Sequence, residues 1–504
     1  MKPRATTVAF VICAVLCGAF AATGPWTFGS LTLRYWQPLF ALCLLIVAPT
    51  LVSLTKREVE FSAAAIWTSL AVIALVLLRM CVLRYQAFEV NAWDFSNSFD
   101  RPIEQTLHGR LLWSDTIGSS MLAQHCNWLS LAFVPLYALH ASPYWLIIAQ
   151  PLAVVAAAAI LFRYARLVAA DDVVAACVAL AFLVNRYTIR ALNEGFVIDI
   201  FYPAGIFLLI YAFTRRNWLL GILALALVLS IKEDAVLTLI GFALVAGVFH
   251  RRWRWAAATL AFALTVFAFD YFVVRASYPG IAVPFAHYWG SFGATPGAAL
   301  AGMLRHPIEV LRRAGPPAFF LFGSMAFLPL IGGAWTIAAL PTIILYTSAD
   351  TEDLHWLALH YSLPFIGLLF ASLPAAIDRL ASRTTLPRRT VAVALLLVSA
   401  FVGTGYKMER SRSEHLWVRG LVDRAGERPV YVEGALFPHA GYESRVRVLH
   451  HTITPPPNSA YLVCATCKPY PFSREELESR IASLRSNAAY TQIRAGDLWL
   501  FVPR

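Results

Sequence analysis

The chain has 504 residues, of which 59% are hydrophobic and only 14% charged, with a formal net charge of +12. Soluble proteins carry about 25% charged residues, so this composition leaves too little polar surface for a set of soluble domains. The basic residues are almost all arginines in short clusters between apolar blocks, a placement that membrane topology explains and that excludes nucleic-acid binding.

The apolar blocks predict an all-α polytopic membrane protein with about thirteen spanning helices, since each block is about as long as the roughly 20 residues that cross a hydrocarbon core. The predicted spans are residues 7–24, 36–54, 62–83, 143–163, 172–188, 197–214, 217–231, 234–250, 255–275, 316–331, 333–347, 357–377 and 388–406. The first is predicted to be a retained helix rather than a signal peptide. The shorter apolar segment 126–140 is predicted to be interfacial or re-entrant.

The basic clusters predict the orientation of the chain in the membrane. They are Lys2 with Arg4, Lys56-Arg57, Arg163 with Arg166, Arg215-Arg216, Arg251 to Arg254, and Arg379 to Arg389. They fall on alternate sides of the spans, and the positive-inside rule places them all in the cytoplasm. The N-terminus is therefore expected in the cytoplasm, and an odd number of spans puts the tail outside. Residues 1–406 are predicted to form the membrane domain and 407–504 a small extracytoplasmic domain.

The tail alternates strand-like runs with one helix, which predicts a small α/β domain. The runs are Arg428 to Glu433, Arg445 to Leu449, Tyr461 to Val463 and Leu498 to Val502. The helix is expected to begin at Ser473, with Glu475 and Glu476 in its first turn. Cys464 and Cys467 form a lone C-x-x-C, consistent either with a local disulfide or with two free thiols. The other six cysteines (Cys13, Cys17, Cys43, Cys81, Cys126 and Cys177) are read as small buried hydrophobes.

Three polar stretches are predicted on the outer side, at about 85–125, 276–316 and 348–355. The first contains Asp94 and Asp100 in an aromatic-rich segment. These carboxylates suit a general base, a metal ligand or a sugar hydrogen-bond acceptor, and solvated loop acids are the alternative. His125 suits anion binding or proton transfer, with a merely interfacial histidine as the alternative.

Further charged residues occur at the outer ends of later spans, where ionisable groups are costly and therefore mark functional sites. Asn193-Glu194 and Asp199 surround the start of one span, and a buried ion pair of Asp199 with Lys232 is the structural alternative. Lys232-Glu233-Asp234 join two spans almost without a loop, where phosphate, metal or hydroxyl binding competes with a plain polar turn. His355, His360 and Tyr361 open another span. Their shared sidedness predicts one outward-facing polar cavity.

Several short motifs, taken in order, resemble the DUF2079 family of predicted bacterial and archaeal membrane proteins. They are W-D-F-S-N-S-F-D (93–100), L-H-G-R (107–110), Q-H-C-N-W-L-S-L (124–131), F-V-I-D-I-F-Y-P (196–203), I-K-E-D (231–234), Y-W-G-S-F-G-A-T-P (288–296), R-H-P (305–307) and L-H-Y-S-L-P (359–364). The resemblance covers about residues 85 to 380. The family is similar to GT-C glycosyltransferases, which take a sugar from a polyprenyl-phosphate donor at the outer membrane face.

The resemblance implies a role for each candidate residue. An acid in the first long outer loop activates the acceptor in GT-C enzymes, which makes Asp94 the expected catalytic base and Asp100 the reserve. Lys232 is expected to hold the lipid phosphate. The donor and acceptor cavity would be lined by His125, Asp199, Lys232, Glu233, Asp234, His360 and Tyr361.

The leading hypothesis is a GT-C-like glycosyltransferase in a bacterial cytoplasmic membrane. Its partners would be a polyprenyl-phosphate sugar donor, membrane lipids, and a glycan, lipid or protein acceptor. The chemistry neither requires nor excludes a divalent metal ion as cofactor. Two other hypotheses are a lipid or solute transporter or flippase, and a non-catalytic membrane assembly protein whose tail binds a partner.

Overall fold

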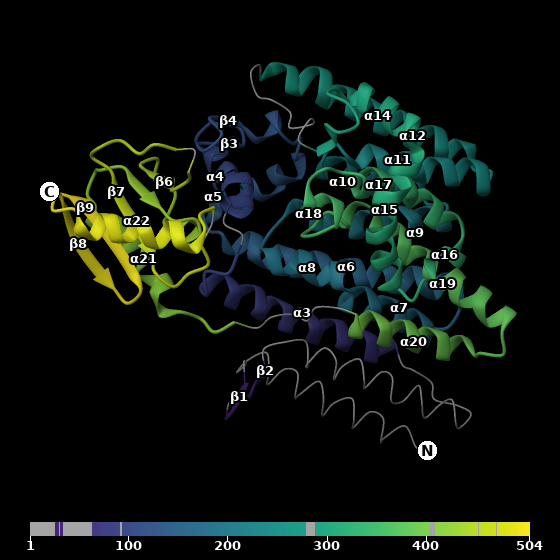
Figure 1. Ribbon diagram of the computed structural model, residues 1–504. Coiled ribbons are helices and arrows are strands. Elements are labelled where there is room, and N and C mark those ends of the chain that lie inside the picture. The colour runs from purple at the N-terminus through teal and green to yellow at the C-terminus, as the bar shows by residue number, and fades with distance from the viewer. Residues whose placement is uncertain are drawn as a thin grey trace.

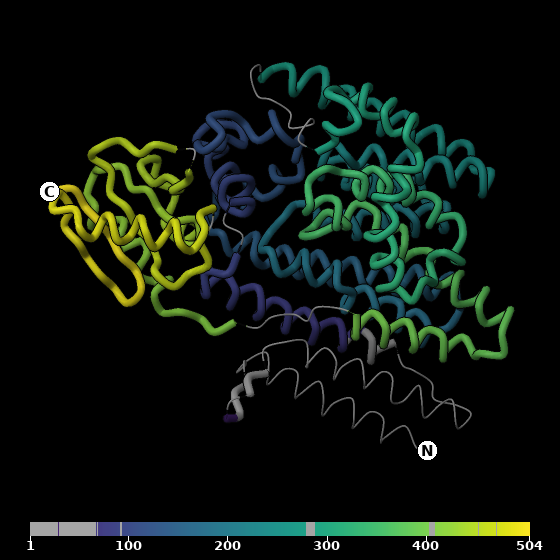
Figure 2. Tube along the Cα trace, in the orientation of Figure 1, coloured from purple at the N-terminus to yellow at the C-terminus, as the bar shows by residue number. Residues whose placement is uncertain are grey.

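A computed structural model describes residues 26–29, 31–33, 63–90, 93–278, 288–402, 409–451, 453–469 and 471–504. These residues form a large helical body and a smaller C-terminal domain built on a five-stranded sheet (Figures 1 and 2). The predicted spans 7–24 and 36–54 lie outside the described residues, as do Cys13, Cys17 and Cys43.

The helical body follows the order of the apolar blocks. Its α-helices are α3 (Ala63–Gln86), α4 (Arg101–Leu107), α5 (Val134–Leu139), α6 (Tyr144–Ala169), α7 (Asp172–Val184), α8 (Arg186–Glu194), α9 (Tyr202–Arg215), α10 (Trp218–Ile231), α11 (Ala235–Leu244), α12 (Trp253–Phe269), α14 (Pro296–Arg305), α15 (Pro307–Gly323), α16 (Pro329–Gly332), α17 (Ala334–Thr347), α18 (Glu352–His355), α19 (Leu363–Arg383) and α20 (Arg388–Phe401). Other helical turns are η1 (Trp93–Asp100), η2 (Met121–Ala123), η3 (Trp128–Phe133), η4 (Ile198–Phe201), η5 (Val245–Phe249), η6 (Asp270–Val274) and η7 (Arg275–Ser277). Two short hairpins, β1 (Trp26–Phe28) with β2 (Leu31–Leu33) and β3 (Trp113–Ser114) with β4 (Ser119–Ser120), complete this part.

Five helical segments within the described ranges are long and apolar enough to cross a membrane. They are Ser69–Gln86, Tyr144–Ala169, Ile198–Arg215, Trp253–Ser277 and Leu363–Arg383. A sixth is added if α7 and α8, which are bent by 44° at their junction, form one span. The helices α10, α11 with η5, and α17 lie where spans were predicted, but with 10–17 residues each they are shorter than the five long segments. The short segment predicted to be interfacial folds as η3 and α5.

One predicted span, 316–331, is wrong as a single helix. α15 begins earlier, at Pro307, and ends at Gly323, and α16 starts only at Pro329. Between them Ala326 and Phe327 have φ angles of 53° and 56°. Two successive residues in the left-handed region cannot continue a right-handed helix, and proline favours the first turn of the next one.

The core of the body is built around α6, which packs against α3, α7, α9 and α19. α7 is buried on almost all faces, as expected of a helix that is apolar all round. Asn185 ends α7 and caps α8, because its side chain accepts a hydrogen bond from the backbone N–H of Tyr187. The Asn185 side chain also donates to Ser324 Oγ at 3.0 Å, which fixes this break in the helix against the turn after α15.

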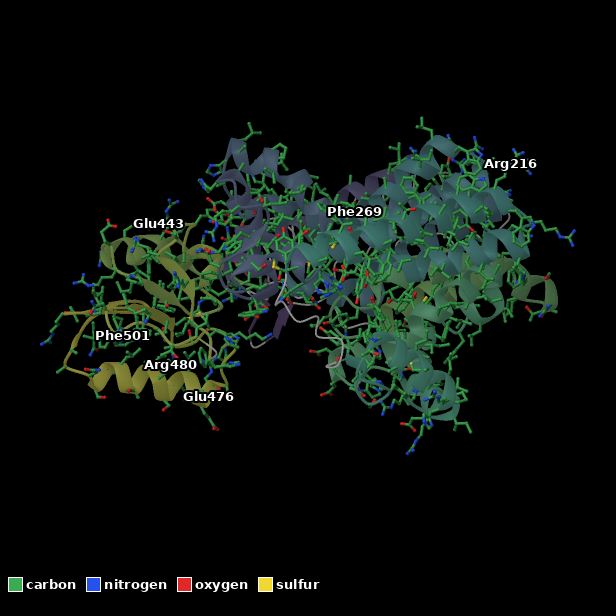
Figure 3. All side chains as sticks on the ribbon, turned by 90° about the horizontal axis from the view of Figure 1, so that it is seen from above. Arg216, Phe269, Glu443, Glu476, Arg480 and Phe501 are labelled. Carbon is green, nitrogen blue, oxygen red and sulfur yellow. A yellow bond between two sulfur atoms is a disulfide. The ribbon has the colours of Figure 1, made fainter. Side chains whose placement is uncertain are left out.

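The helical body has an arginine-rich end far from the C-terminal domain. Figure 3 shows Arg216 at that end, and Phe501 and Glu443 of the C-terminal domain at the opposite end of the molecule. Ion pairs hold the arginine-rich end together: Arg166 with Asp172 at 2.7 Å, Arg388 with Asp378 at 3.1 Å, and Arg389 with Asp171 at 2.9 Å.

The C-terminal domain contains α21 (Val418–Arg424), β5 (Val430–Val432), β6 (Val446–Val448), β7 (Ala460–Cys464), α22 (Arg474–Ser486), β8 (Tyr490–Ala495) and β9 (Leu498–Pro503). The sheet order is β6-β5-β7-β9-β8, with β5 parallel to both its neighbours and the β7–β9 and β9–β8 pairs antiparallel. The four predicted strands and the helix after Ser473 are present. Ser473 and Glu476 form the reciprocal capping box that their spacing predicts.

The cysteines differ between the two parts of the chain. Cys464 and Cys467 are joined by a disulfide within the C-x-x-C segment. Cys81, Cys126 and Cys177 are buried thiols, as predicted for small hydrophobes.

The C-terminal domain is docked on the segment that follows α3. Phe88, just beyond α3, is 1% exposed and belongs to the hydrophobic core of the C-terminal domain. The Arg101 guanidinium donates to the carbonyl oxygens of Gly441 and Val446 and lies over the ring of Phe437. The two parts therefore pack against each other through a shared hydrophobic core and are not connected by a linker alone.

Glu433 makes the stability of this domain depend on pH. It is fully buried, its Oε2 accepts from the Cys464 N–H at 2.8 Å, and its Oε1 has no hydrogen-bond partner. Burial raises its pKa from 4.5 to about 8. Because the folded state favours the protonated form, its contribution is complete below about pH 4.5 and is lost as pH rises through about 8.

We expect this single group to lower the free energy of unfolding by about 1.4 kcal/mol per pH unit between those limits. Glu433→Gln should remove that slope, which thermal unfolding of the detergent-solubilised full chain at pH 5 to 8 would measure. Glu443→Gln is the matched control, because Glu443 is exposed and pairs with Arg445 at 2.6 Å. Equal slopes in the wild type and in Glu433→Gln would contradict the prediction.

Candidate functional site

The ends of several helices meet, at the end of the body away from the arginine-rich end, around the turn between α10 and α11. Glu233 in this turn lies 3.0 Å from His125 Nδ1 through Oε1, and the same oxygen accepts from Arg275 Nη2 at 2.9 Å. Its Oε2 accepts from the backbone N–H of Cys126 at 3.1 Å. Glu233 thus joins the segment before η3 to η7.

The neighbouring acid, Asp234, has a different set of partners. Its carboxylate accepts hydrogen bonds from the hydroxyls of Tyr202 and Tyr346, and it lies 4.0 Å from Lys232 Nζ. Asp199, which is 5% exposed in η4 just before α9, also attracts Lys232 electrostatically. The lysine therefore already faces two carboxylates, as in the structural alternative of a buried ion pair.

A third part of the cluster joins α8 to the segment before α19. Glu194, the last residue of α8, has its Oε2 at 3.0 Å from His360 Nδ1, within hydrogen-bond distance. The rings of His360 and Tyr361 lie 4.6 Å apart. Asp94 in η1 is half-buried and close enough to interact electrostatically with Glu194 and Tyr361. Asp94 therefore belongs to the same cluster.

Asp100 does not share these neighbours. It is 2% exposed and accepts from the hydroxyls of Tyr137 at 2.6 Å and Tyr442 at 2.7 Å. Burial raises the pKa of Asp100 to about 6, against the two tyrosine hydrogen bonds, which lower it. Because Tyr442 belongs to the C-terminal domain, these contacts place Asp100 at the docking interface of the two parts.

The structure brings together eight of the nine residues predicted for the site: Asp94, His125, Asp199, Lys232, Glu233, Asp234, His360 and Tyr361. Sequence reasoning did not include Arg275, Tyr202 and Tyr346 in the site, although each contacts one of its acids. A signal existed for Tyr202, which lies three residues after Asp199 in the quoted F-V-I-D-I-F-Y-P motif. Arg275 and Tyr346 carry no such signal.

The charges of the cluster limit its chemistry. Five carboxylates (Asp94, Glu194, Asp199, Glu233 and Asp234) face two permanent cations, Lys232 and Arg275, and two histidines. Within the described ranges, no three His, Cys, Asp or Glu side chains are grouped so as to hold a metal ion. Glu233 and Asp234 are held by hydrogen bonds and ion pairs within the cluster, and Asp94 is a half-buried acid that interacts electrostatically with Glu194 and Tyr361. The arrangement suits proton transfer at Asp94 supported by a fixed polar wall.

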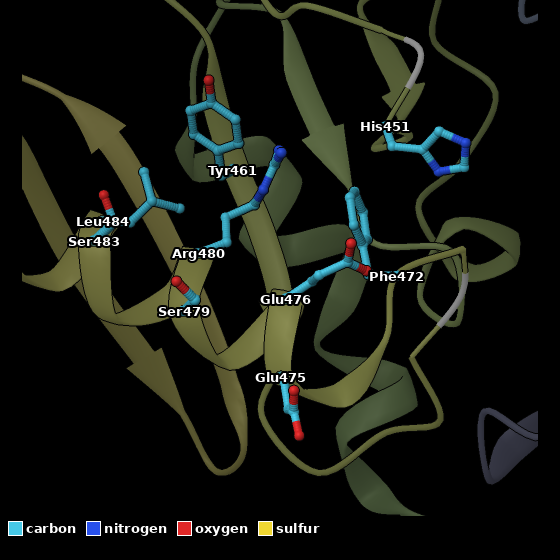
Figure 4. A pocket seen from close by; sticks show the side chains of 9 residues that line it. All are labelled: His451, Tyr461, Phe472, Glu475, Glu476, Ser479, Arg480, Ser483 and Leu484. Carbon is cyan, nitrogen blue, oxygen red and sulfur yellow. The ribbon is translucent and has the colours of Figure 1, made fainter.

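Two cavities lie away from this cluster. One of about 150 Å³ is between the segment 97–116 and the C-terminal domain and is lined by Arg101, Asp115 and Phe437, among others. Another of about 750 Å³ is a broad concavity on the C-terminal domain beside α22, with Tyr461, Phe472 and Arg480 in its wall (Figure 4). Arg480 lies over the ring of Phe472, and Glu476 is engaged in the capping box of α22. The ionisable cluster, rather than either cavity, is therefore the candidate site.

Residues 84–419 match the model of a family described as "Predicted membrane protein (DUF2079)". No curated protein matches the chain. The matched region contains every residue of the cluster and ends at the beginning of the C-terminal domain.

Proposed function

Because the chain belongs to the DUF2079 family of predicted membrane proteins, whose motif residues form the cluster described above, we propose that it is a GT-C-like membrane glycosyltransferase. It takes a sugar from a polyprenyl-phosphate donor and transfers it to a glycan, lipid or protein acceptor. One observation carries the proposal: a half-buried carboxylate, Asp94, belongs to a single polar cluster at one end of the helical body.

The proposal includes a topology. About thirteen spans place the N-terminus in the cytoplasm and the C-terminal domain outside a bacterial cytoplasmic membrane. The arginine-rich end then faces the cytoplasm under the positive-inside rule, and the cluster lies at the outer surface. The Cys464–Cys467 disulfide supports this orientation, because disulfides persist in extracytoplasmic compartments.

In the proposed reaction, Asp94 accepts the proton of an acceptor hydroxyl. The acceptor oxygen forms a bond to the anomeric carbon of the donor as the bond from that carbon to the phosphate oxygen breaks. The polyprenyl phosphate leaves with the bonding electron pair. Polar groups fixed by the Glu233 and Asp234 networks stabilise the charges that develop, and such preorganised groups contribute most where water is excluded.

A transporter is the second candidate, and one observation favours it. The α7–α8 pair is broken at Asn185, and α15 and α16 are separated by a turn that the Asn185 side chain contacts. Broken helices packed near ionisable residues are common in transporters. In that case the cluster would bind a solute or lipid headgroup without consuming it.

The test separates consumption of a donor from its movement. The full chain is reconstituted in liposomes with a radiolabelled polyprenyl-phosphate sugar, and the label is followed into acceptor glycan, into free sugar, and across the bilayer. Transfer or hydrolysis of the donor is the expected result. Movement of an intact donor across the bilayer without any consumption would contradict the enzyme and favour the transporter.

A further inference from the structure

One face of α8 carries two arginines. Arg186, Arg190 and Asn193 are spaced four and three residues apart, so they lie on the same side of the helix. None of the three is buried, whereas Tyr187, Thr188, Ala191 and Leu192 on the other side are. We call Arg186 and Arg190 the α8 arginine pair.

No acid neutralises this pair within the part of the chain that the structure describes. Among the described residues, neither guanidinium has a carboxylate oxygen within 4.0 Å and the buried Nε of Arg186 has no hydrogen-bond acceptor. The ring of Tyr187 lies 5.4 Å from the Arg186 guanidinium. At the arginine-rich end, by contrast, Arg166, Arg388 and Arg389 each pair with an aspartate.

The lack of a neutralising acid is unusual because of where the α8 arginine pair lies in the fold. α7 and α8 together pass as one broken membrane span, and both arginines lie in its second half. Arg186 precedes the helix end at Glu194 by eight residues, or about 12 Å along the axis at about 1.5 Å per residue. Charged side chains inside a span are costly, and they are usually retained where they meet an opposite charge.

We propose that the α8 arginine pair binds the phosphate of the polyprenyl-phosphate donor; this inference rests on the proposed function and moves the phosphate away from Lys232. Two guanidinium groups present planar sets of N–H donors that match phosphate oxygens. Lys232 is less suited to that task, because Asp234 and Asp199 already compensate its charge.

The position along α8 also suits the rest of the donor. Arg190 lies one turn, about 6 Å along the axis, before Glu194, which interacts electrostatically with Asp94. A phosphate held at the pair therefore lies on the helix that ends in the cluster, which places the sugar that it carries toward the catalytic base.

The test measures binding of undecaprenyl monophosphate, without any sugar, to the full chain in nanodiscs of neutral lipid. We expect Arg186→Gln with Arg190→Gln to weaken binding about tenfold to hundredfold, the effect of losing hydrogen bonds to a charged group. Arg215→Gln with Arg216→Gln, at the opposite end, is the matched control and should bind as the wild type does. Competition by millimolar inorganic phosphate against the lipid would show that the bare phosphate suffices, whereas no competition would show that the lipid is required.

Equal affinity of the wild type and the double glutamine variant would overturn the inference. The variant Arg186→Lys with Arg190→Lys guards against misfolding, because it keeps both charges. Affinity between that of the wild type and that of the glutamine variant supports contact with the phosphate. Affinity as low as that of the glutamine variant, with an unchanged melting temperature, supports a need for the geometry of the guanidinium groups. Lipid binding that depends on the pair, in a protein that never consumes a donor, would uphold this site and contradict only the glycosyltransferase.

Discussion

Replacing Asp94 by Asn is expected to lower the rate of sugar transfer by about 10²–10⁴-fold, the usual contribution of a positioned general base. Asn has nearly the same size and still accepts a hydrogen bond, but it cannot take the acceptor proton at neutral pH. Asp94 interacts electrostatically with Glu194 and Tyr361, whereas the phosphate site proposed above consists of Arg186 and Arg190. The variant should therefore bind undecaprenyl phosphate like the wild type.

The measurement is single-turnover transfer from a labelled polyprenyl-phosphate sugar. Asp115→Asn is a matched control, because Asp115 lies between α3 and η2 as Asp94 does but pairs with Arg110 at 3.1 Å, away from the cluster. An equal loss of transfer in both variants would remove Asp94 as the base. A loss of lipid binding in Asp94→Asn alone would make it a binding residue instead.

Replacing Lys232 by Met should destabilise the folded protein by about 3–5 kcal/mol, because it leaves a buried negative charge without its partner. The Lys232 and Asp234 side chains are 14% and 16% exposed, and Asp199 adds a second carboxylate nearby. Methionine keeps the apolar stem but removes the ammonium group. Guanidinium unfolding of the detergent-solubilised chain would measure the loss.

A second substitution gives this prediction a sharp control. Asp234→Asn added to Lys232→Met removes one of the unpaired charges and should recover part of the lost stability, which a double-mutant cycle measures as a coupling free energy. Arg216→Met, at an exposed position, should have almost no effect. If Lys232→Met were as stable as Arg216→Met, the lysine would not be the counter-charge of the cluster.

The sequence predicted the parts of the fold that depend on long or local patterns. Apolar length gave α3 and α6, and the spacing of Ser473 and Glu476 gave the start of α22. β8 was missed because it is an edge strand whose residues alternate between exposed and half-buried, without an apolar run. The break after Gly323 was missed because residues 316–331 stay apolar across it, and a positive φ at Ala326 leaves no mark in composition.

The site divides in the same way. Four residues were predicted to lie on the same side of the membrane, because each is at the outer end of a predicted span: His125, Asp199, Lys232 and His360. The structure brings these residues together. Their partners could not be predicted, because they depend on how distant helices are rotated against one another. Arg275 reaches Glu233 from 42 positions along the chain, and Tyr346 reaches Asp234 from 112. Asp100 looked like Asp94 in sequence and differs only through Tyr137 and Tyr442.

The placement of Phe88 inside the C-terminal core has a consequence for biosynthesis. Phe88 emerges from the ribosome early, but the residues that enclose it, from Val418 to Val502, are made last. Until they arrive, the segment carrying Asp94 can pack only on the helical body and the Phe88 side chain remains uncovered. A chain released before its final strand is made would therefore be inserted in the membrane with Phe88 exposed. The C-terminal domain can dock on the segment after α3 only when synthesis is complete.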